Sequence, residues 1–268
     1  RTGSLFKIRA LEQWWKMNKA TSFDEFYSIL EMNEIPGYNI GYADKDDNIF
    51  YISNGLIPIR NDKFKWTGVL PGNTSETLWT DYYKTHELPQ VINPKSGYIY
   101  NANHSPFLST SIDENPNPQD FASNMGFETF NNNRSTRIFE LVESHKSIDY
   151  ETFKKIKYDN KFPTPFNYNF MDVNNIMEMQ PDNYPEVADL IKQIQNWDRS
   201  TDASSTGAGA FAMFYYTLAD KYFYKSYYDR NFSKSLIADC LVEVKKRMKK
   251  YFDSTTVKLG DFQKLVRG

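Results

Sequence analysis

The segment NPKSGYIYNANHSP, from Asn93 to Pro106, holds the residues best suited to a chemical role. A short aromatic and β-branched run there ends in a polar loop at Asn103. A carboxamide at the end of a rigid run can donate a hydrogen bond to an oxygen that becomes negative during acyl transfer. The alternative is that Asn103 only shapes the turn through a local hydrogen bond. Asn101 is the neighbour most easily confused with it, and only one of the two is expected to be the donor.

Other residue types that often do chemistry predict no further site. His86, His104 and His145 lie far apart without metal-ligand spacing, so we interpret them as ordinary surface or loop histidines. The only cysteine, Cys240, lies in the apolar run IADCLVEV, which favours an inert core thiol. The acidic cluster DKDDN that begins at Asp44 lacks the later glycine and glutamate of a calcium-binding loop, so a hairpin turn explains it.

Strands early and helices late in the chain predict an α+β fold that positions these residues. The period of two in GYNIGYADKDDNIFYISNG, residues 37–55, predicts an antiparallel hairpin. Dense proline and glycine over residues 56–97 indicate a long ordered loop, and residues 98–102 are expected to form another short strand. No repeat or low-complexity linker marks a domain boundary.

Helical patterns are predicted at both ends of the chain. The opening segment has Leu5, Ile8, Leu11 and Trp15 at helical intervals, and a capping box from Ser22 starts a second helix. Later helices are predicted over 134–146, from a cap near Ser147 or Asp149, from Pro185, and around 207–227 and 232–252. The helix predicted around 207–227 carries an aromatic stripe, which we interpret as part of the core. Its members are Phe211, Phe214, Tyr215 and Leu218.

Composition limits the classes of partner. With 268 residues the chain can bury a substantial core as one large domain or two small ones. A net charge of −2 provides no electrostatic footprint for nucleic acid or an anionic membrane, so neither is expected as a partner. No apolar run approaches the roughly 20 residues that span a bilayer. The high aromatic content, 16%, is typical of proteins with polar ligand clefts.

Four segments occur in an order that resembles a known family: YADKDDNIFYISNGLIPIR (42–60), WTGVLPG (66–72), LPQVINPKSGYIYNANHSP (88–106) and RSTRIFELV (134–142). Together they resemble the large subunit of penicillin-acylase-type N-terminal-nucleophile hydrolases. The LPG before Trp79 and the NAN before Ser-Pro look most like acylases of homoserine lactones and lipopeptides. The resemblance implies that 1–268 is a single segment of that subunit, part of an αββα sandwich of antiparallel sheets flanked by helices, with a helix-rich C-terminal half.

The resemblance also implies site residues. It places the family's oxyanion asparagine on Asn103, beside a backbone N–H from outside the segment. Arg134 matches an arginine that orients the active-site network, whereas Arg137 is interpreted as a surface or ion-pair residue. Tyr38 falls where the family has an acyl-pocket side chain, and a core tyrosine on the hairpin is an equally good interpretation.

The implied reaction is hydrolysis of an acyl amide in an N-acylated small molecule, of penicillin, acyl-homoserine-lactone or lipopeptide type, through an acyl-enzyme. The nucleophile is expected to be a serine exposed by self-cleavage at the start of the large subunit, a role that Arg1 cannot fill. The missing part of that subunit and a small subunit are therefore expected partners, and residues 1–268 alone are expected to be inactive.

No cofactor is expected for this reaction. Asp113 and Glu114 lie where some family members have a calcium ligand, which leaves a structural calcium ion open. Family members are exported, so a periplasmic or secreted location is expected. Two alternatives stay open: a non-catalytic module that binds a glycan or peptide through Tyr and Trp residues, or a family member that has lost activity.

Overall fold

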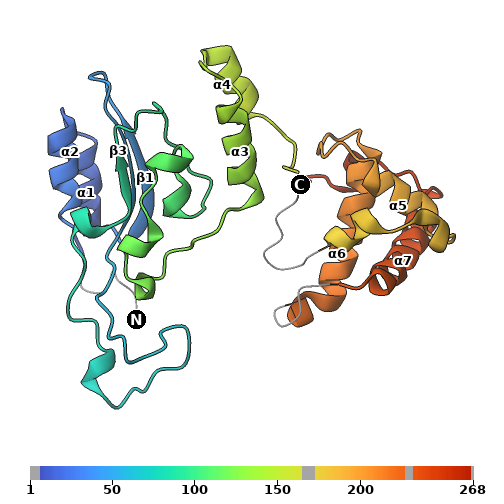
Figure 1. Ribbon diagram of the computed structural model, residues 1–268, viewed down its shortest axis with the longest axis horizontal. Coiled ribbons are helices and arrows are strands. Elements are labelled where there is room, and N and C mark those ends of the chain that lie inside the picture. Colours follow the sequence, from blue (N-terminus) through green and yellow to red (C-terminus); the bar gives the residue numbers. More distant parts are fainter. Residues whose placement is uncertain (1–6, 165–172, 227–231, 267–268) are drawn as a thin grey trace. The chain divides into compact units, whose positions relative to one another are not determined.

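The computed structural model describes residues 7–164, 173–226 and 232–266. The chain divides into two compact units, an N-terminal unit, Arg1–Asn131, and a C-terminal unit, Asn132–Gly268 (Figure 1). Each unit has its own hydrophobic core. The boundary falls in the asparagine run 131–133, which composition alone did not mark.

The N-terminal unit combines two helices with one antiparallel sheet. Within its described residues, β2 is the central strand between β1 and β3 (Figure 1). The hairpin of β1 and β2 confirms the predicted pairing over residues 37–55, with Gly37 opposite Gly55 and Ala43 opposite Ile49. The elements are α1 (Ala10–Met17), α2 (Phe23–Leu30), β1 (Gly37–Ala43), β2 (Ile49–Gly55) and β3 (Gln90–Ile92).

Asp44 closes the hairpin turn, as the acidic cluster predicted. Its carboxylate accepts hydrogen bonds from the backbone N–H of Asp46, at 2.9 Å, and of Asn48, at 3.0 Å. Asp47 takes a left-handed backbone with a φ of 62°, which short polar residues tolerate in turns. The side chain of Asp44 therefore makes the bonds of a turn and explains the position of the cluster.

One face of the sheet packs against α1 and α2 and forms the core of the N-terminal unit. Ile40, Phe50 and Ile52 from the strands are buried with Phe26 and Leu30 from α2. These strand residues alternate, as expected for a sheet with one covered face. The opposite face carries Asn39, Gly41, Tyr51 and Ser53, as the register of the strands requires.

The helix α1 buries a polar residue where its apolar stripe points outward. Ile8 and Leu11 are exposed, and Leu5 lies outside the described residues. Gln13 is fully buried instead, and its side chain donates to the carbonyl of Ile29 at 3.1 Å and accepts from Glu34 N–H at 2.8 Å. Gln13 thus satisfies backbone groups at the end of α2, a requirement that outweighs apolar spacing.

The predicted strand over residues 98–102 is wrong. These residues are irregular because their backbone bonds to the chain that follows them: Tyr100 N–H donates to Ser109 at 2.9 Å, and Thr110 Oγ1 donates to the Tyr98 carbonyl at 2.8 Å. Short 3-10 helices occupy the rest of the loop region, at Ser75–Thr77, Thr85–Glu87, Pro106–Leu108, Ile112–Glu114, Pro118–Asp120 and Ser123–Met125.

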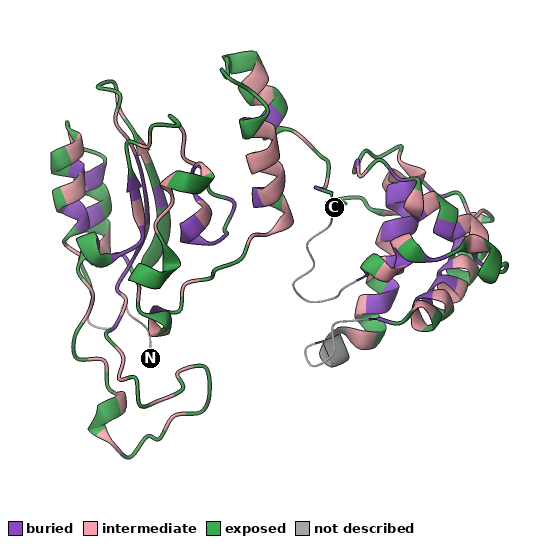
Figure 2. Cartoon of the chain, in the orientation of Figure 1, coloured by how far each residue is buried: buried purple, intermediate pink, exposed green. Residues whose placement is uncertain are grey.

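The regular secondary structure in the described residues of the C-terminal unit is helical, apart from one isolated antiparallel bridge between Lys161 and Ser200. Figure 2 shows buried residues along α5, α6 and α7, whose side chains share one core. The elements are α3 (Asn133–Glu143), α4 (Tyr150–Lys157), α5 (Ala188–Gln195), α6 (Thr206–Ser226), α7 (Lys234–Phe252) and α8 (Leu259–Phe262), with 3-10 helices at Asn174–Glu178 and Pro181–Asn183. The predicted helices are confirmed, although the one expected from Pro185 begins at Ala188.

Local predictions in this unit are also confirmed. Asp149 caps α4 by accepting the N–H of Thr152 at 2.7 Å. Phe214 and Leu218 are fully buried in the core, as the aromatic stripe predicted. Cys240 is buried beside them, and burial raises the pKa of its thiol, which is the opposite of what an activated nucleophile needs.

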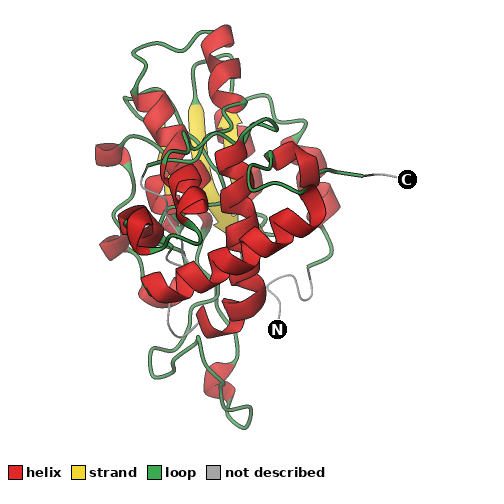
Figure 3. Ribbon diagram, turned by 90° about the vertical axis from the view of Figure 1, so that its right-hand side faces the viewer, coloured by secondary structure: helices red, strands yellow, loops and turns green. Residues whose placement is uncertain are grey.

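Helices and one antiparallel sheet together confirm the α+β class, and the C-terminal half is helix-rich as expected (Figure 3). None of the described helices combines the length and apolar character that crossing a bilayer requires.

Candidate functional site

Asn103 lies at the tip of a tight turn in the N-terminal unit. Its φ is 55°, a left-handed conformation that asparagine adopts more readily than most residues other than glycine. The residue is exposed, while Ala102 and His104 on either side of it are buried. The backbone N–H of Asn103 donates to Oδ1 of Asn101 at 3.0 Å. The turn therefore presents Asn103 outward from an ordered base.

Asn101 and Asn103 have different roles in this turn. The local side-chain to backbone bond that sequence reasoning offered as the alternative for Asn103 is made by Asn101. That bond holds the backbone N–H of Asn103. That only one of the two asparagines donates to an oxyanion stays a prediction.

His104 holds the other side of the turn from a buried position. Its Nδ1 accepts the backbone N–H of Ala102 at 3.0 Å, and its Nε2 lies 2.8 Å from the carbonyl oxygen of Leu108. Because a carbonyl only accepts, Nε2 carries the proton and the ring is the neutral Nε2–H tautomer. The Tyr100 ring stacks on the imidazole at a centroid distance of 4.8 Å. His104 is thus a structural histidine of the loop.

A polar network joins the turn to the face of the sheet opposite α1 and α2. Nδ2 of Asn101 donates to the Tyr51 hydroxyl at 3.4 Å, and that hydroxyl donates to Oδ1 of Asn39 at 3.1 Å. Tyr51 is only 1% exposed, and burial raises the pKa of its phenol, which keeps the hydroxyl protonated. Sequence reasoning missed this network. The available signal was that Tyr51 falls on the opposite face from Phe50, where a buried hydroxyl needs a partner.

Tyr38 lies on the helix-covered side of the sheet, near the start of β1. Its ring is 54% exposed and meets Trp14 of α1 edge-to-face at a centroid distance of 5.7 Å. It is therefore not a core tyrosine of this unit. Asn101 bonds to side chains on the other face, so the structure does not bring Tyr38 and the Asn103 turn onto one face of the sheet.

Arg134 belongs to the C-terminal unit, in the first turn of α3. It is exposed and borders a hollow of about 190 Å³ with Asn160, Lys161 and Thr201. Arg137, one turn later, makes a two-pronged ion pair with Asp159 at 2.8 and 2.9 Å. That contact confirms the interpretation of Arg137 as an ion-pair residue.

Of the acidic pair Asp113 and Glu114 beyond the turn, Glu114 bonds to backbone. The Glu114 carboxylate accepts the N–H groups of Lys95, at 2.5 Å, and Ser96, at 2.8 Å, and these bonds with Ser96 and Lys95 hold its pKa below the usual range. No group of three or more His, Cys, Asp or Glu side chains within the described ranges is arranged to hold a metal ion. Glu114 serves as an anchor between two loops.

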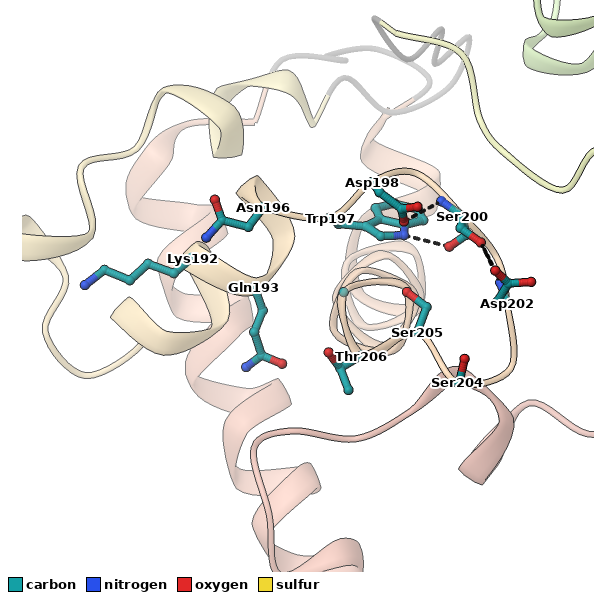
Figure 4. A pocket seen from close by; sticks show the side chains of 11 residues that line it. Lys192, Gln193, Asn196, Trp197, Asp198, Ser200, Asp202, Ser204, Ser205 and Thr206 are labelled. Carbon is teal, nitrogen blue, oxygen red and sulfur yellow. Dashed lines mark hydrogen bonds between the residues drawn. The ribbon is translucent and has the colours of Figure 1, made fainter.

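A larger polar hollow of about 560 Å³ lies between α5 and the start of α6 in the C-terminal unit (Figure 4). Its acidic and hydroxyl groups bond to one another: Ser200 Oγ donates to Asp202 at 2.5 Å, and Asp198 accepts the Ser200 N–H at 3.0 Å. Trp197 Nε1 donates to the Ser200 carbonyl at 2.7 Å. These bonds shape a turn, and no predicted site residue lines the hollow.

Two known proteins are similar to parts of this chain. Penicillin G acylase from Escherichia coli is 31% identical over 100 residues, which are 37% of this chain and 12% of that protein. Thermostable penicillin G acylase from Alcaligenes faecalis has a similar fold, with a TM-score of 0.61 at 14% sequence identity, over 91% of this chain and 52% of that chain. The chain thus spans about half the length of its structural relative and a smaller share of the curated one.

The likeness in fold agrees with the mixed architecture of helices and antiparallel sheet expected from the sequence. The penicillin amidase family model matches residues 2–264, a range that includes Tyr38, the Asn103 turn and Arg134. Because this match covers nearly the whole sequence, the chain belongs to the penicillin amidase family.

Proposed function

We propose that the intact protein containing this chain hydrolyses an acyl amide bond in an N-acylated small molecule, and that Asn103 donates a hydrogen bond to the oxyanion. The family match over residues 2–264 is the observation that carries this proposal. The exposed turn supports it, because the carboxamide of Asn103 stands on a backbone held at a left-handed φ of 55°. Non-glycine residues that are held in a left-handed backbone conformation cluster at active sites.

The proposed reaction has two stages. A nucleophilic hydroxyl outside residues 1–268 adds to the amide carbon, and the α-amine of the same N-terminal residue, with a reference pKa of about 8, takes its proton. The carbonyl oxygen becomes negative, and the Asn103 side chain stabilises it beside a backbone N–H. The amine then leaves with a proton, and water hydrolyses the acyl-enzyme. These steps use protein groups and water alone and call for no cofactor.

Arg134 and Tyr38 complete the proposal. The Arg134 guanidinium offers five donors in a fixed planar fork, which suits it to hold carbonyls and carboxylates of the active-site network. Tyr38, with Trp14 against its ring, presents exposed aromatic surface for an acyl group. We propose that Arg134 orients the active-site network and that Tyr38 determines which acyl chains fit.

The relatives support an acyl amide as the substrate. Both are penicillin G acylases, and an N-acylated small molecule of penicillin, acyl-homoserine-lactone or lipopeptide type is the corresponding proposal here. The intact protein is proposed to mature by self-cleavage and to act in the periplasm or outside the cell.

The test is removal of the Asn103 amide in the intact, self-processed protein. Asn103→Gly is the sharper variant, because glycine adopts a φ of 55° without strain, whereas Asn103→Ala also strains the backbone. Loss of one oxyanion donor typically lowers kcat by about 10² to 10³. Steady-state kinetics on a panel of N-acyl amides measures this. An unchanged kcat in Asn103→Gly removes the assignment, and a processed parent without turnover supports an inactive family member.

A further inference from the structure

The side chains of Asn101 and His104 hold the backbone of the Asn103 turn. Oδ1 of Asn101 accepts the N–H of Asn103 at 3.0 Å, and Nδ1 of His104 accepts the N–H of Ala102 at 3.0 Å. Two consecutive backbone N–H groups are thereby satisfied by side chains from either side of the tip. The geometry of these two hydrogen bonds determines where the atoms of Asn103 are placed.

Asn101 is itself anchored to the sheet. Its Nδ2 donates to the Tyr51 hydroxyl at 3.4 Å, and Nδ2 of Asn39 lies 3.5 Å from its Oδ1. The Tyr51 hydroxyl in turn donates to Oδ1 of Asn39 at 3.1 Å, which links all three side chains. Asn39 and Tyr51 come from β1 and β2, two paired strands of the sheet. The tip of a loop is therefore tied to the β1–β2 hairpin at the centre of the sheet.

We infer that Asn101 and Tyr51 are positioning residues for the oxyanion donor, which transmit the position of the β1–β2 sheet to Asn103. This inference rests on the proposed function. The physical reason is that an oxyanion donor works only when it is already aimed at the oxygen, and a misplacement of about 1 Å can cost about 10²-fold in rate. Asn101 orients the backbone, and the Tyr51 hydroxyl orients Asn101.

A purely structural role would give a different result. If Asn101 only stabilised the loop, its loss would lower the unfolding temperature and leave kcat of the folded protein unchanged. If it positions the donor, its loss lowers kcat while KM changes little, and the effect disappears once the donor is removed. A double-mutant cycle between Asn101 and Asn103 separates these cases.

The experiment uses the intact, self-processed acylase, with kcat, KM and thermal unfolding measured for each variant. The variants are Asn101→Ala, Asn101→Ser, Tyr51→Phe, Asn103→Gly and the double variant Asn101→Ala with Asn103→Gly. Serine at position 101 keeps a weaker acceptor for the same turn bond. Phenylalanine at position 51 keeps the buried ring and removes only the hydroxyl. It also provides a second test if Asn101→Ala fails to fold.

Asn93 provides a matched control. It is another asparagine of this unit with a left-handed backbone, φ 45°, and its Oδ1 accepts the Ile49 N–H at 2.8 Å. It has no part in the Asn101–Tyr51 network. Asn93→Ala should lower stability and leave kcat at the parent value. A loss of kcat in this control equal to that of Asn101→Ala would show a general effect of loop strain and overturn the inference.

The expected result is a kcat about 10 to 100 times lower for Asn101→Ala, with KM within about threefold of the parent. Asn101→Ser should recover part of the loss, Tyr51→Phe should show a smaller loss, and the double variant should equal Asn103→Gly alone. If the fold-loss of kcat in the double variant equals the product of the two single losses, the inference is overturned. An unchanged kcat for both Asn101→Ala and Tyr51→Phe also overturns it. If Asn103→Gly itself keeps the parent kcat, the proposed function of Asn103 has failed, and the inference with it.

Discussion

At Asn103 the chain stores conformational strain at an exposed position. A left-handed non-glycine residue costs of order 1–3 kcal/mol and persists only when its surroundings enforce it. Here the surroundings are the bonds from Asn101 and His104 to the turn backbone. Other left-handed residues of this unit, such as Asp47 in the hairpin, close ordinary turns. Asn103 differs because its turn is tied through Asn101 to the buried Tyr51.

Tyr38 is predicted to set the length of the acyl group. Tyr38→Ala should shift the preferred acyl chain toward longer homologues, because one methylene in an apolar pocket is worth about 1–3 kcal/mol. The measurement is kcat/KM across N-acyl amides that differ by one methylene. Tyr150→Ala is the control, since Tyr150 is an exposed tyrosine of α4. An identical chain-length profile in parent and Tyr38→Ala would exclude Tyr38 from the acyl pocket.

At the scale of elements, Arg137 in α3 pairs with Asp159, which lies two residues after the end of α4. Hydrogen bonds from Arg137 lower the pKa of the Asp159 carboxyl, and desolvation opposes them only in part. A carboxyl whose folded pKa is lowered adds stability above its unfolded pKa of about 3.9. That stability is lost as the pH falls through the lower pKa that Asp159 has in the folded state.

Asp159→Asn is therefore predicted to destabilise the C-terminal unit by about 1–3 kcal/mol at pH 7, the range for hydrogen bonds to charged groups. The difference from the parent should shrink as the pH falls below about 3.9. Thermal unfolding from pH 7 to pH 3 measures it. Glu151→Gln in α4 removes an exposed pair and should change stability by less than about 0.5 kcal/mol. A pH-independent difference for Asp159→Asn would contradict this account.

Gly209 allows α6 to approach the chain segment before α8. A Cβ added there would overlap the carbonyl oxygen of Val257, whereas a Cβ at Gly72 would meet nothing within 4 Å. Alanine is favoured over glycine inside a helix by about 1 kcal/mol, so Gly209→Ala should stabilise if only propensity mattered. We predict net destabilisation of about 1–3 kcal/mol from overpacking. Chemical denaturation measures it, with Gly72→Ala as the control; a stabilised Gly209→Ala would refute the close approach.

At the scale of the whole molecule, the family match extends across both compact units, and the chain spans about half of its structural relative. The nucleophile is proposed to lie outside residues 1–268. Purified 1–268 is therefore predicted to show no turnover of N-acyl amides, because an oxyanion donor lowers a barrier only for a nucleophile that attacks. Product release from a panel of N-acyl amides, followed by chromatography, measures this. Turnover at enzymatic rates would contradict the prediction.

Much of the architecture could be predicted from local patterns. The hairpin, the Asp149 cap of α4 and the helices from Asn133 onward depend on interactions between residues close in sequence, which spacing reveals. The strand expected over residues 98–102 failed because its backbone partners, Ser109 and Thr110, come from a loop that only folding brings alongside. The outward stripe of α1 failed to predict burial because Gln13 was needed to satisfy the end of α2.

The sequence by itself determined the family, the α+β class and the identity of Asn103 as the residue to examine, because motif order and periodicity are written along the chain. Only the tertiary structure decided that Asn101 makes the local turn bond, that Tyr51 and Asn39 anchor it, and that Tyr38 is exposed beside Trp14. Asn39 and Asn101 are 62 positions apart, and hydrogen bonds over that separation depend on how strands and loops pack. Packing brings such residues together, and no local pattern records it.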